Sequence, residues 1–167
     1  MFLSLSCVLG LFGKRLIAPA GNLITDLLHI PGGVNTAFSL MFITIGCSLV
    51  PFFGCGTLMG LVQGLLALAL GRVGSMGILS PIGYTVPGLI IDLVMLLGRK
   101  VFKKSGLIPV IANMLGSVSA ALTADIIVFR LPLAPLFLYL MVGALFGAVF
   151  GLLASMLIKR LKPVIKL

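Results

Sequence analysis

The chain consists of six long apolar runs. Short clusters of proline, glycine or basic residues separate them. A helix needs about 20 apolar residues to cross the hydrocarbon core of a bilayer, and most of these runs approach that length. We therefore expect an all-α, polytopic membrane protein, a compact bundle of six transmembrane helices that forms a single domain over residues 1–167. The predicted helices cover about residues 2–18, 35–50, 55–71, 78–98, 107–129 and 133–158.

Proline and glycine interrupt the pattern at two places. Residues 19–34 (PAGNLITDLLHIPGGV) contain two prolines and three glycines beside the polar residues Asn22, Asp26 and His29. Because proline and glycine break helices, we expect a structured loop or lid over this stretch. Pro87 should kink the fourth helix unless neighbouring helices satisfy the carbonyl that it frees.

Small residues recur at helical spacing in three of the predicted helices. Such spacing leaves a groove without side chains, in which a second membrane helix can approach backbone to backbone. In the third and sixth helices we expect the groove to serve packing within the bundle, whereas the stripe on the first helix contacts either this chain or a partner. The three sets are Gly56, Gly60 and Gly64; Gly143, Gly147 and Gly151; and Ser6, Gly10 and Gly13.

Composition and charge agree with a membrane location. The mean hydropathy is +1.32, 60% of the residues are apolar and only 9% are charged. The net charge of +9 comes from basic residues in joints and at the tail, which do not form the solvated basic face that nucleic acid requires. With six spans, eight of the twelve Lys and Arg residues share one side with both termini. The positive-inside rule therefore predicts that both termini are cytoplasmic.

No arrangement of residues typical of an enzyme emerges from the sequence. The chain has no Glu and a single His, and it lacks the GxSxG, HExxH and GxxxxGK[ST] motifs. Cys7, Cys47 and Cys55 lie in apolar or glycine-rich surroundings without CxxC spacing, which predicts small packing residues. The apolar N-terminus has no basic region before it and no AxA-like site soon after it, so we interpret it as the first helix rather than a signal peptide. We expect no enzymatic activity and no cofactor.

Three features of the chain occur together: the small residues of the first helix, the HIPGG loop, and the run GTLMGLVQGLLALALG followed by YTVPGLIIDLV. In these features the chain resembles the substrate-binding S components of energy-coupling factor (ECF) transporters. The resemblance implies a multi-pass protein of a prokaryotic plasma membrane that binds a micronutrient from outside. It also implies docking on a transmembrane coupling subunit, which two ABC ATPases supply with energy. Ser6, Gly10 and Gly13 occupy the place of that family's docking motif.

We expect the ligand site toward the outer half of the bundle, between the 19–34 loop and the third to fifth helices. The chain has no Glu and three Asp, so it offers few negative charges to bind a cationic ligand. Arginine residues on the outer side would pair well with a ligand that carries carboxylates. This balance favours a neutral or anionic, fairly apolar ligand. Two candidates are haem, with His29 near the iron, and a vitamin precursor. The candidate ligand-binding residues are Asn22, Asp26, His29, Gln63, Arg72, Tyr84 and Arg130.

Two other classes of protein remain alternatives. One is a structural or assembly protein whose glycine faces recruit a larger complex. The other is a self-sufficient channel or secondary transporter, for which we would expect more ionisable residues within the membrane and an internal repeat. The sequence alone leaves open whether Asp92 and Asp125 are structural or functional.

Overall fold

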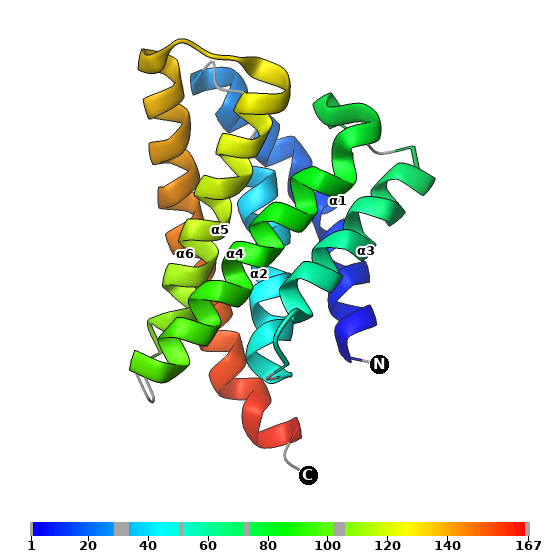
Figure 1. The fold of residues 1–167 in the computed structure, drawn as a ribbon, viewed down its shortest axis with the longest axis vertical. Coiled ribbons are helices and arrows are strands. Elements are labelled where there is room, and N and C mark those ends of the chain that lie inside the picture. Colours follow the sequence, from blue (N-terminus) through cyan, green and yellow to red (C-terminus); the bar gives the residue numbers. More distant parts are fainter. Residues whose placement is uncertain (1, 29–33, 51, 72–73, 102–105, 166–167) are drawn as a thin grey trace.

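The fold is helical throughout the part of the chain that the computed structural model describes, which comprises residues 2–28, 34–50, 52–71, 74–101 and 106–165 (Figure 1). No strand occurs in these ranges, so the predicted all-α class is confirmed. A 3-10 helix, η1 (Gly74–Leu79), and a π turn, η2 (Asp125–Phe129), accompany the α-helices. The α-helices are α1 (Phe2–Leu28), α2 (Val34–Leu49), α3 (Cys55–Ala69), α4 (Ser80–Val101), α5 (Ile108–Ala124) and α6 (Leu133–Ile165).

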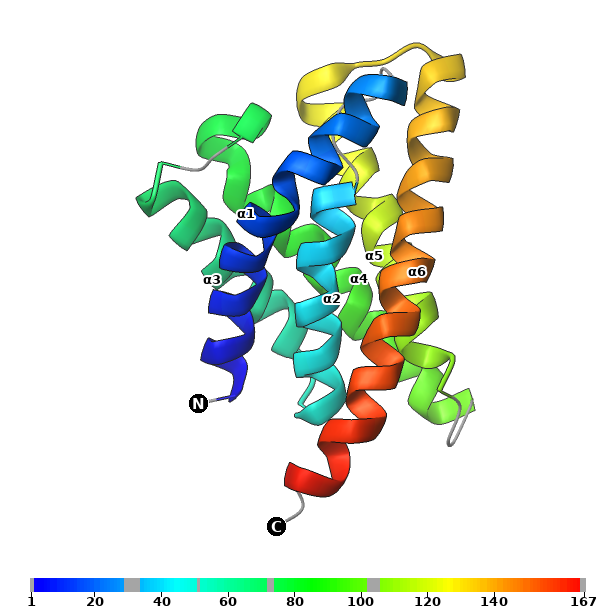
Figure 2. The ribbon, with the colours of Figure 1, turned by 180° about the vertical axis from the view of Figure 1, so that it is seen from behind.

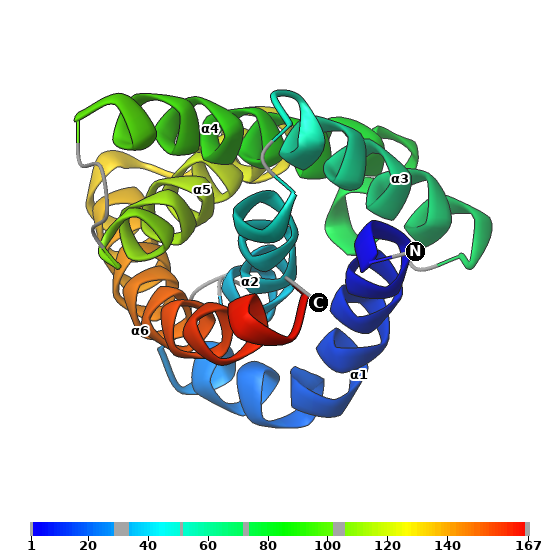
Figure 3. The ribbon, with the colours of Figure 1, turned by 90° about the horizontal axis from the view of Figure 1, so that it is seen from below.

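Helix α2 lies at the centre of the bundle. Viewed along the long axis, the other helices form a ring around it (Figure 3), and α2 contacts α1, α3, α4, α5 and α6. Its 16 residues carry no charge, and the consecutive residues Ser39, Leu40 and Met41, which point to different sides of the helix, are all buried. A helix that is hydrophobic all round is expected to be enclosed by protein or lipid. The polar side chains of α2 must therefore find their partners inside the bundle.

Successive helices run in opposite directions along the bundle. The first turn of α1 and the last turns of α6 lie at one end, the lower end in Figures 1 and 2. The turns η1 and η2 lie together at the opposite end, where they contact each other. The C-terminal end of α1 reaches that same upper end (Figure 2).

Three helical stretches of the described chain are long and apolar enough to cross a membrane: Met76–Gly98, Ile108–Phe129 and Leu133–Pro163. Helices α2 and α3 are apolar but shorter, at 16 and 15 residues. Large apolar side chains cover the outside of the bundle, with Leu133 of α6 and Leu16 of α1 more than four-fifths exposed. These features are those of a protein embedded in a membrane.

The predicted close packing through the glycine faces of α3 and α6 is confirmed. A Cβ atom added to Gly56 would lie 2.6 Å from the carbonyl oxygen of Gly88 in α4. A Cβ atom added to Gly151 of α6 would lie 2.7 Å from the Cα atom of Val110 in α5. Only glycine permits such approaches of one backbone to another. Both glycine faces are therefore occupied within this chain.

The expectation of a loop over residues 19–34 is wrong for its first part. Helix α1 continues through Pro19 to Leu28, and residues 29–33 lie outside the described residues. Proline removes one hydrogen bond from a helix, but a break would leave several backbone groups without partners in an apolar environment. The helix continues because that second cost is larger. Helix α4 continues through Pro87 in the same way.

Asp92 serves as the N-terminal cap of α3. Its carboxylate accepts hydrogen bonds from the backbone N–H groups of Gly56 and Thr57, both at 2.8 Å, and from the Thr57 hydroxyl at 2.8 Å. These N–H groups have no partner within their own helix, and a negative charge there also interacts favourably with the helix dipole. Asp92 thus joins α4 to the start of α3 and has a structural role.

Asp125 stabilises the turn between α5 and α6. Its carboxylate accepts a hydrogen bond from the backbone N–H of Leu131 at 2.8 Å, and its carbonyl oxygen accepts one from the N–H of Arg130 at 2.8 Å. Arg130 has a left-handed backbone with a φ of 48°, so this turn needs local hydrogen bonds. Asp125 therefore also has a structural role.

Candidate functional site

Helix α1 packs on α2 and α3 through three of its glycines. A Cβ atom added to Gly10 would lie 2.6 Å from the side-chain amide nitrogen of Gln63, and one added to Gly13 would lie 2.8 Å from the ring of Phe38. A Cβ atom on Gly21 would overlap the side-chain amide of Asn35. We call this contact the α1 seam. It comprises Gly10, Gly13 and Gly21 of α1, Asn35, Phe38, Ser39 and Phe42 of α2, and Gln63 of α3.

The Gln63 side chain is fully buried in the seam with only one of its two polar atoms satisfied. Its Oε1 accepts a hydrogen bond from the Ser39 hydroxyl, at a long 3.3 Å. Its Nε2 points at Gly10 and has no hydrogen-bond partner. Leaving a buried polar group unpaired costs about 1–3 kcal/mol.

Asn35 lies one helical turn before Ser39 on α2. Its side-chain amide also has one polar atom with a hydrogen bond and one without. Its Nδ2 donates a hydrogen bond to Oδ1 of Asn22 in α1 at 3.0 Å. Its Oδ1 is buried and has no partner. In the described part of the chain, Gln63 Nε2 and Asn35 Oδ1 are the buried side-chain atoms without a hydrogen bond, and both belong to the α1 seam.

The buried side-chain amide of Asn113 in α5 differs from these two, because both of its polar atoms are hydrogen-bonded. Its Nδ2 donates to the carbonyl oxygen of Gly147 at 2.8 Å and to that of Ala37 at 3.4 Å, and its Oδ1 accepts from the Thr44 hydroxyl at 3.3 Å. Asn113 therefore links α2, α5 and α6 with both of its polar atoms paired. Buried polar groups in proteins are normally paired in this way, so the two exceptions in the α1 seam require an explanation.

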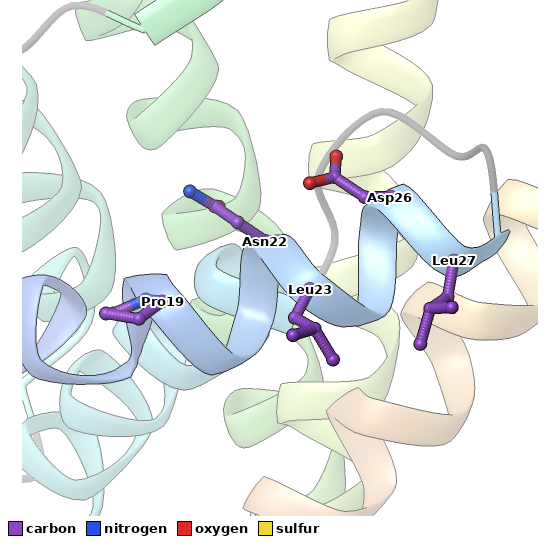
Figure 4. A pocket seen from close by; sticks show the side chains of 5 residues that line it. All are labelled: Pro19, Asn22, Leu23, Asp26 and Leu27. Atoms are coloured by element: carbon purple, nitrogen blue, oxygen red, sulfur yellow. The ribbon is translucent and has the colours of Figure 1, made fainter.

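A shallow, largely open hollow of about 540 Å³ runs along the C-terminal part of α1, next to the seam, and residues of α1 alone line it. The side chains of Asn22 and Asp26 extend to one side of the helix, and those of Leu23 and Leu27 extend to the other (Figure 4). Asn22 belongs both to this hollow and, through Asn35, to the seam. The polar lining of the hollow therefore reaches the side chain of Asn35 through Asn22. The hollow is lined by Pro19, Asn22, Leu23, Asp26 and Leu27.

The structure brings together two of the predicted ligand-binding residues. Asn22 and Gln63 both contact the same face of α2, through Asn35 and Ser39 respectively. Asp26 lies one turn beyond Asn22, exposed in the hollow.

The remaining predicted ligand-binding residues lie elsewhere or outside the described residues. Tyr84 of α4 contributes its backbone to the close contact with Gly60 of α3. Arg130 is exposed at the turn between η2 and α6. His29 and Arg72 lie outside the described residues, so the prediction that His29 approaches a haem iron stays a prediction.

Two of the predicted docking residues lie on the inner side of α1. Gly10 and Gly13 face Gln63 and Phe38, and the side chain of Ser6 lies outside the described residues. Docking of a partner through this face stays a prediction. It would require α1 to separate from α2 and α3.

Asn35 and Ser39 were not among the residues predicted from the sequence. A signal was present, because the two lie four residues apart and therefore on one face of an otherwise strongly apolar helix. Polar residues within membrane helices usually pair with one another or face a cavity. Their partners on α1 and α3 are visible only in the folded bundle.

No protein-family model, curated protein or solved structure matches this chain. Within the described ranges, no group of three or more His, Cys, Asp or Glu side chains is placed to hold a metal ion.

Proposed function

We propose that this protein is a membrane-embedded substrate-binding subunit of an ECF-type importer. It captures a vitamin-like micronutrient or cofactor from outside and passes it to a coupling subunit served by two ABC ATPases. The observation that supports this proposal is that two buried amide atoms in the α1 seam, Gln63 Nε2 and Asn35 Oδ1, lack a hydrogen-bond partner. A bound molecule with hydrogen-bonding groups provides the missing partners.

The energetic cost of the seam favours a binding role over a purely structural one. Two unpaired atoms at about 1–3 kcal/mol each are a substantial share of the 5–15 kcal/mol that stabilises a typical domain. Leucine at Gln63 would fill a similar volume without that cost. Proteins tolerate such costs mainly where function requires them.

The arrangement of the helices supports a topology with six spans. Helices α1 to α6 alternate in direction, and both termini lie at one end (Figures 1 and 2). Helix α2 is only about 24 Å long at 1.5 Å per residue, but it is enclosed by the other helices and needs no lipid-facing length of its own. With both termini cytoplasmic, the hollow beside α1 faces outward, as an importer requires.

The alternative of an assembly protein loses its main support. That interpretation relied on glycine faces that are free to recruit a larger complex. The faces of α3 and α6 instead pack against α4 and α5.

The proposal is tested by identifying what the protein carries. The wild type and Gln63→Leu are purified from native membranes in lipid nanodiscs, and released small molecules are identified by mass spectrometry. The matched control is Ser119→Ala, because the Ser119 hydroxyl bonds only to the Gly116 carbonyl of its own helix at 2.8 Å. We expect one molecule enriched with the wild type and the control but lost from Gln63→Leu. Equal amounts in all three samples and in empty nanodiscs would refute the proposal, and a haem absorption band would identify haem as the cargo.

A further inference from the structure

Three sulfur atoms lie together where α2 ends and α3 begins, away from the α1 seam. The side chains of Cys47 in α2 and Cys55 in α3 are hydrogen-bonded to each other. The Cys55 Sγ atom also lies 3.9 Å from the Sδ atom of Met59, one turn further along α3. All three residues are 2% exposed and belong to one buried cluster, and both thiols are free. The fold thus brings two thiols and a thioether together from two helices.

The spacing of the sulfur atoms suits a shared metal ion. A metal ion lies about 2.3 Å from a thiolate sulfur, so two sulfur ligands at 120° around one ion are about 4 Å apart. The 3.9 Å between Cys55 Sγ and Met59 Sδ matches that separation. Cys47 adjoins Cys55 from the facing helix and provides the third sulfur.

The chemistry of these ligands selects a soft ion. Thiolate and thioether sulfur prefer Cu(I), whereas Mg²⁺, Ca²⁺ and Mn²⁺ prefer oxygen ligands. A structural zinc site takes four ligands, and the described ranges bring no three His, Cys, Asp or Glu side chains together for one. Cu(I) is satisfied by two or three sulfur ligands, so two cysteines and a methionine are sufficient for it.

The charge of the cluster also favours a monovalent ion. A thiol that binds a metal ion loses its proton, so a sulfur–metal bond replaces an S–H bond and the proton passes to water. One thiolate, one thiol and one thioether around Cu(I) have no net charge. A neutral site avoids the large cost of burying a net charge in an apolar interior.

The position of the cluster favours a metal ion over a disulfide. Helix α2 ends and α3 begins at the end of the bundle that holds both termini, the lower end in Figures 1 and 2. With both termini cytoplasmic, the cluster lies near a reducing compartment, where neighbouring cysteines more often bind metal than form a disulfide. Cys55 follows a short joint in which Phe52 and Phe53 are exposed, so an ion approaches it through that joint.

We infer that Cys47, Cys55 and Met59 form a binding site for a soft monovalent metal ion, Cu(I), at the joint between α2 and α3. This site goes beyond the proposed import function and does not depend on it. An ion held there links the last turn of α2 to the first turn of α3.

Competition for Cu(I) with a coloured chelator, bathocuproine disulfonate, tests the inference. Proteins in lipid nanodiscs are titrated without oxygen and with ascorbate, and empty nanodiscs are subtracted. Each variant also contains Cys7→Ala, so that Cys47 and Cys55 are the thiols that remain, and this parent protein is compared once with the wild type. The variants are Cys47→Ala, Cys55→Ala and Met59→Leu. The matched control is Met41→Leu, because Met41 is buried to a similar degree but packs against α6.

We expect the wild type, the parent and the control to bind one Cu(I) with equal affinity. Each cysteine variant should bind no Cu(I) at chelator concentrations that leave the parent saturated. Met59→Leu should weaken binding about tenfold or more, the loss that even an indirect partner of a metal ligand causes. It keeps both thiols and a similar side-chain volume, so it tests the site even if a cysteine variant fails to fold.

Three results would overturn the inference. The first is equal affinity of Met59→Leu and Met41→Leu, and the second is binding by the parent no tighter than by empty nanodiscs. The third is a disulfide between Cys47 and Cys55 in protein isolated from native membranes, because an oxidised pair has no thiolate to bind the ion.

Discussion

Replacing Gln63 by leucine should stabilise the protein, which is unusual for the removal of a buried polar side chain. The substitution removes the unpaired Nε2 atom, a gain of about 1–3 kcal/mol. It also removes the 3.3 Å hydrogen bond from Ser39, a loss of about 0.5–1.5 kcal/mol. The Ser39 hydroxyl can then bond to a carbonyl of its own helix, as Thr44, Ser48 and Ser117 do.

The net gain is therefore on the order of 1 kcal/mol, which raises the Tm by about 2–4 °C for a chain of this size. The protein has no Trp, so a thiol-reactive dye is the better probe of unfolding. Cys47 and Cys55 are both 2% exposed and become reactive as the bundle opens. The Tm of wild type and variant is compared in the same detergent.

Asn113→Leu is the matched control, because it removes an amide of similar burial whose polar atoms are all paired. It should lower the Tm, since it breaks the link between α2, α5 and α6 and leaves Thr44 one partner fewer. A decrease in Tm for Gln63→Leu as large as that for Asn113→Leu would refute the reasoning. It would mean that the Gln63 amide stabilises the fold and that its Nε2 atom does not lower the stability of the protein.

Three further predictions follow from the packing and the topology. Gly60→Val should destabilise the protein by about 1–3 kcal/mol, because the new side chain meets the backbone of Tyr84. The control Leu61→Val, at an exposed position, should not, and equal Tm values for the two variants would contradict the α3–α4 contact. Asp92→Ala should lower the Tm by about 4 °C or more, since it leaves the first N–H groups of α3 without a cap, and an unchanged Tm would show that other groups replace it. Reporter fusions at Lys103 and at the C-terminus should both indicate the cytoplasm and a fusion at Ser75 the outside; opposite locations for the first two would exclude six spans.

The sequence predicted the helices well because apolar length and proline or glycine joints are local signals. The predicted run at 35–50 became α2 (Val34–Leu49), and the run at 55–71 became α3 (Cys55–Ala69). The close packing of Gly56, Gly60 and Gly64 was equally predictable, since a four-residue glycine spacing specifies a face without side chains.

The errors arose where a local signal competed with the surroundings. Pro19 suggested a break in the helix, but an apolar environment penalises unpaired backbone groups more than one lost hydrogen bond. The role of Asp92 stayed open in the sequence, because its partners are backbone groups 35 and 36 residues away.

The candidate site was predictable only in part. Asn22 and Gln63 were recognisable as polar residues in apolar or glycine-rich stretches. Asn35 and Ser39 became significant only when the fold placed α1 and α3 on the same side of α2. The unpaired state of an amide depends on every neighbour at once, so no pattern along the chain encodes it.

The central position of α2 has a consequence for how the protein is made. Helix α2 is synthesised early, yet its side chains Met41 and Ile45 pack against Ala154 and Ile158 of α6, which is synthesised last. Until α6 arrives, that side of α2 has lipid or a chaperone as its neighbour, and the hydrogen bond between Asn113 and Gly147 cannot form. A chain that is truncated after α5 therefore keeps its first five helices but lacks a closed bundle.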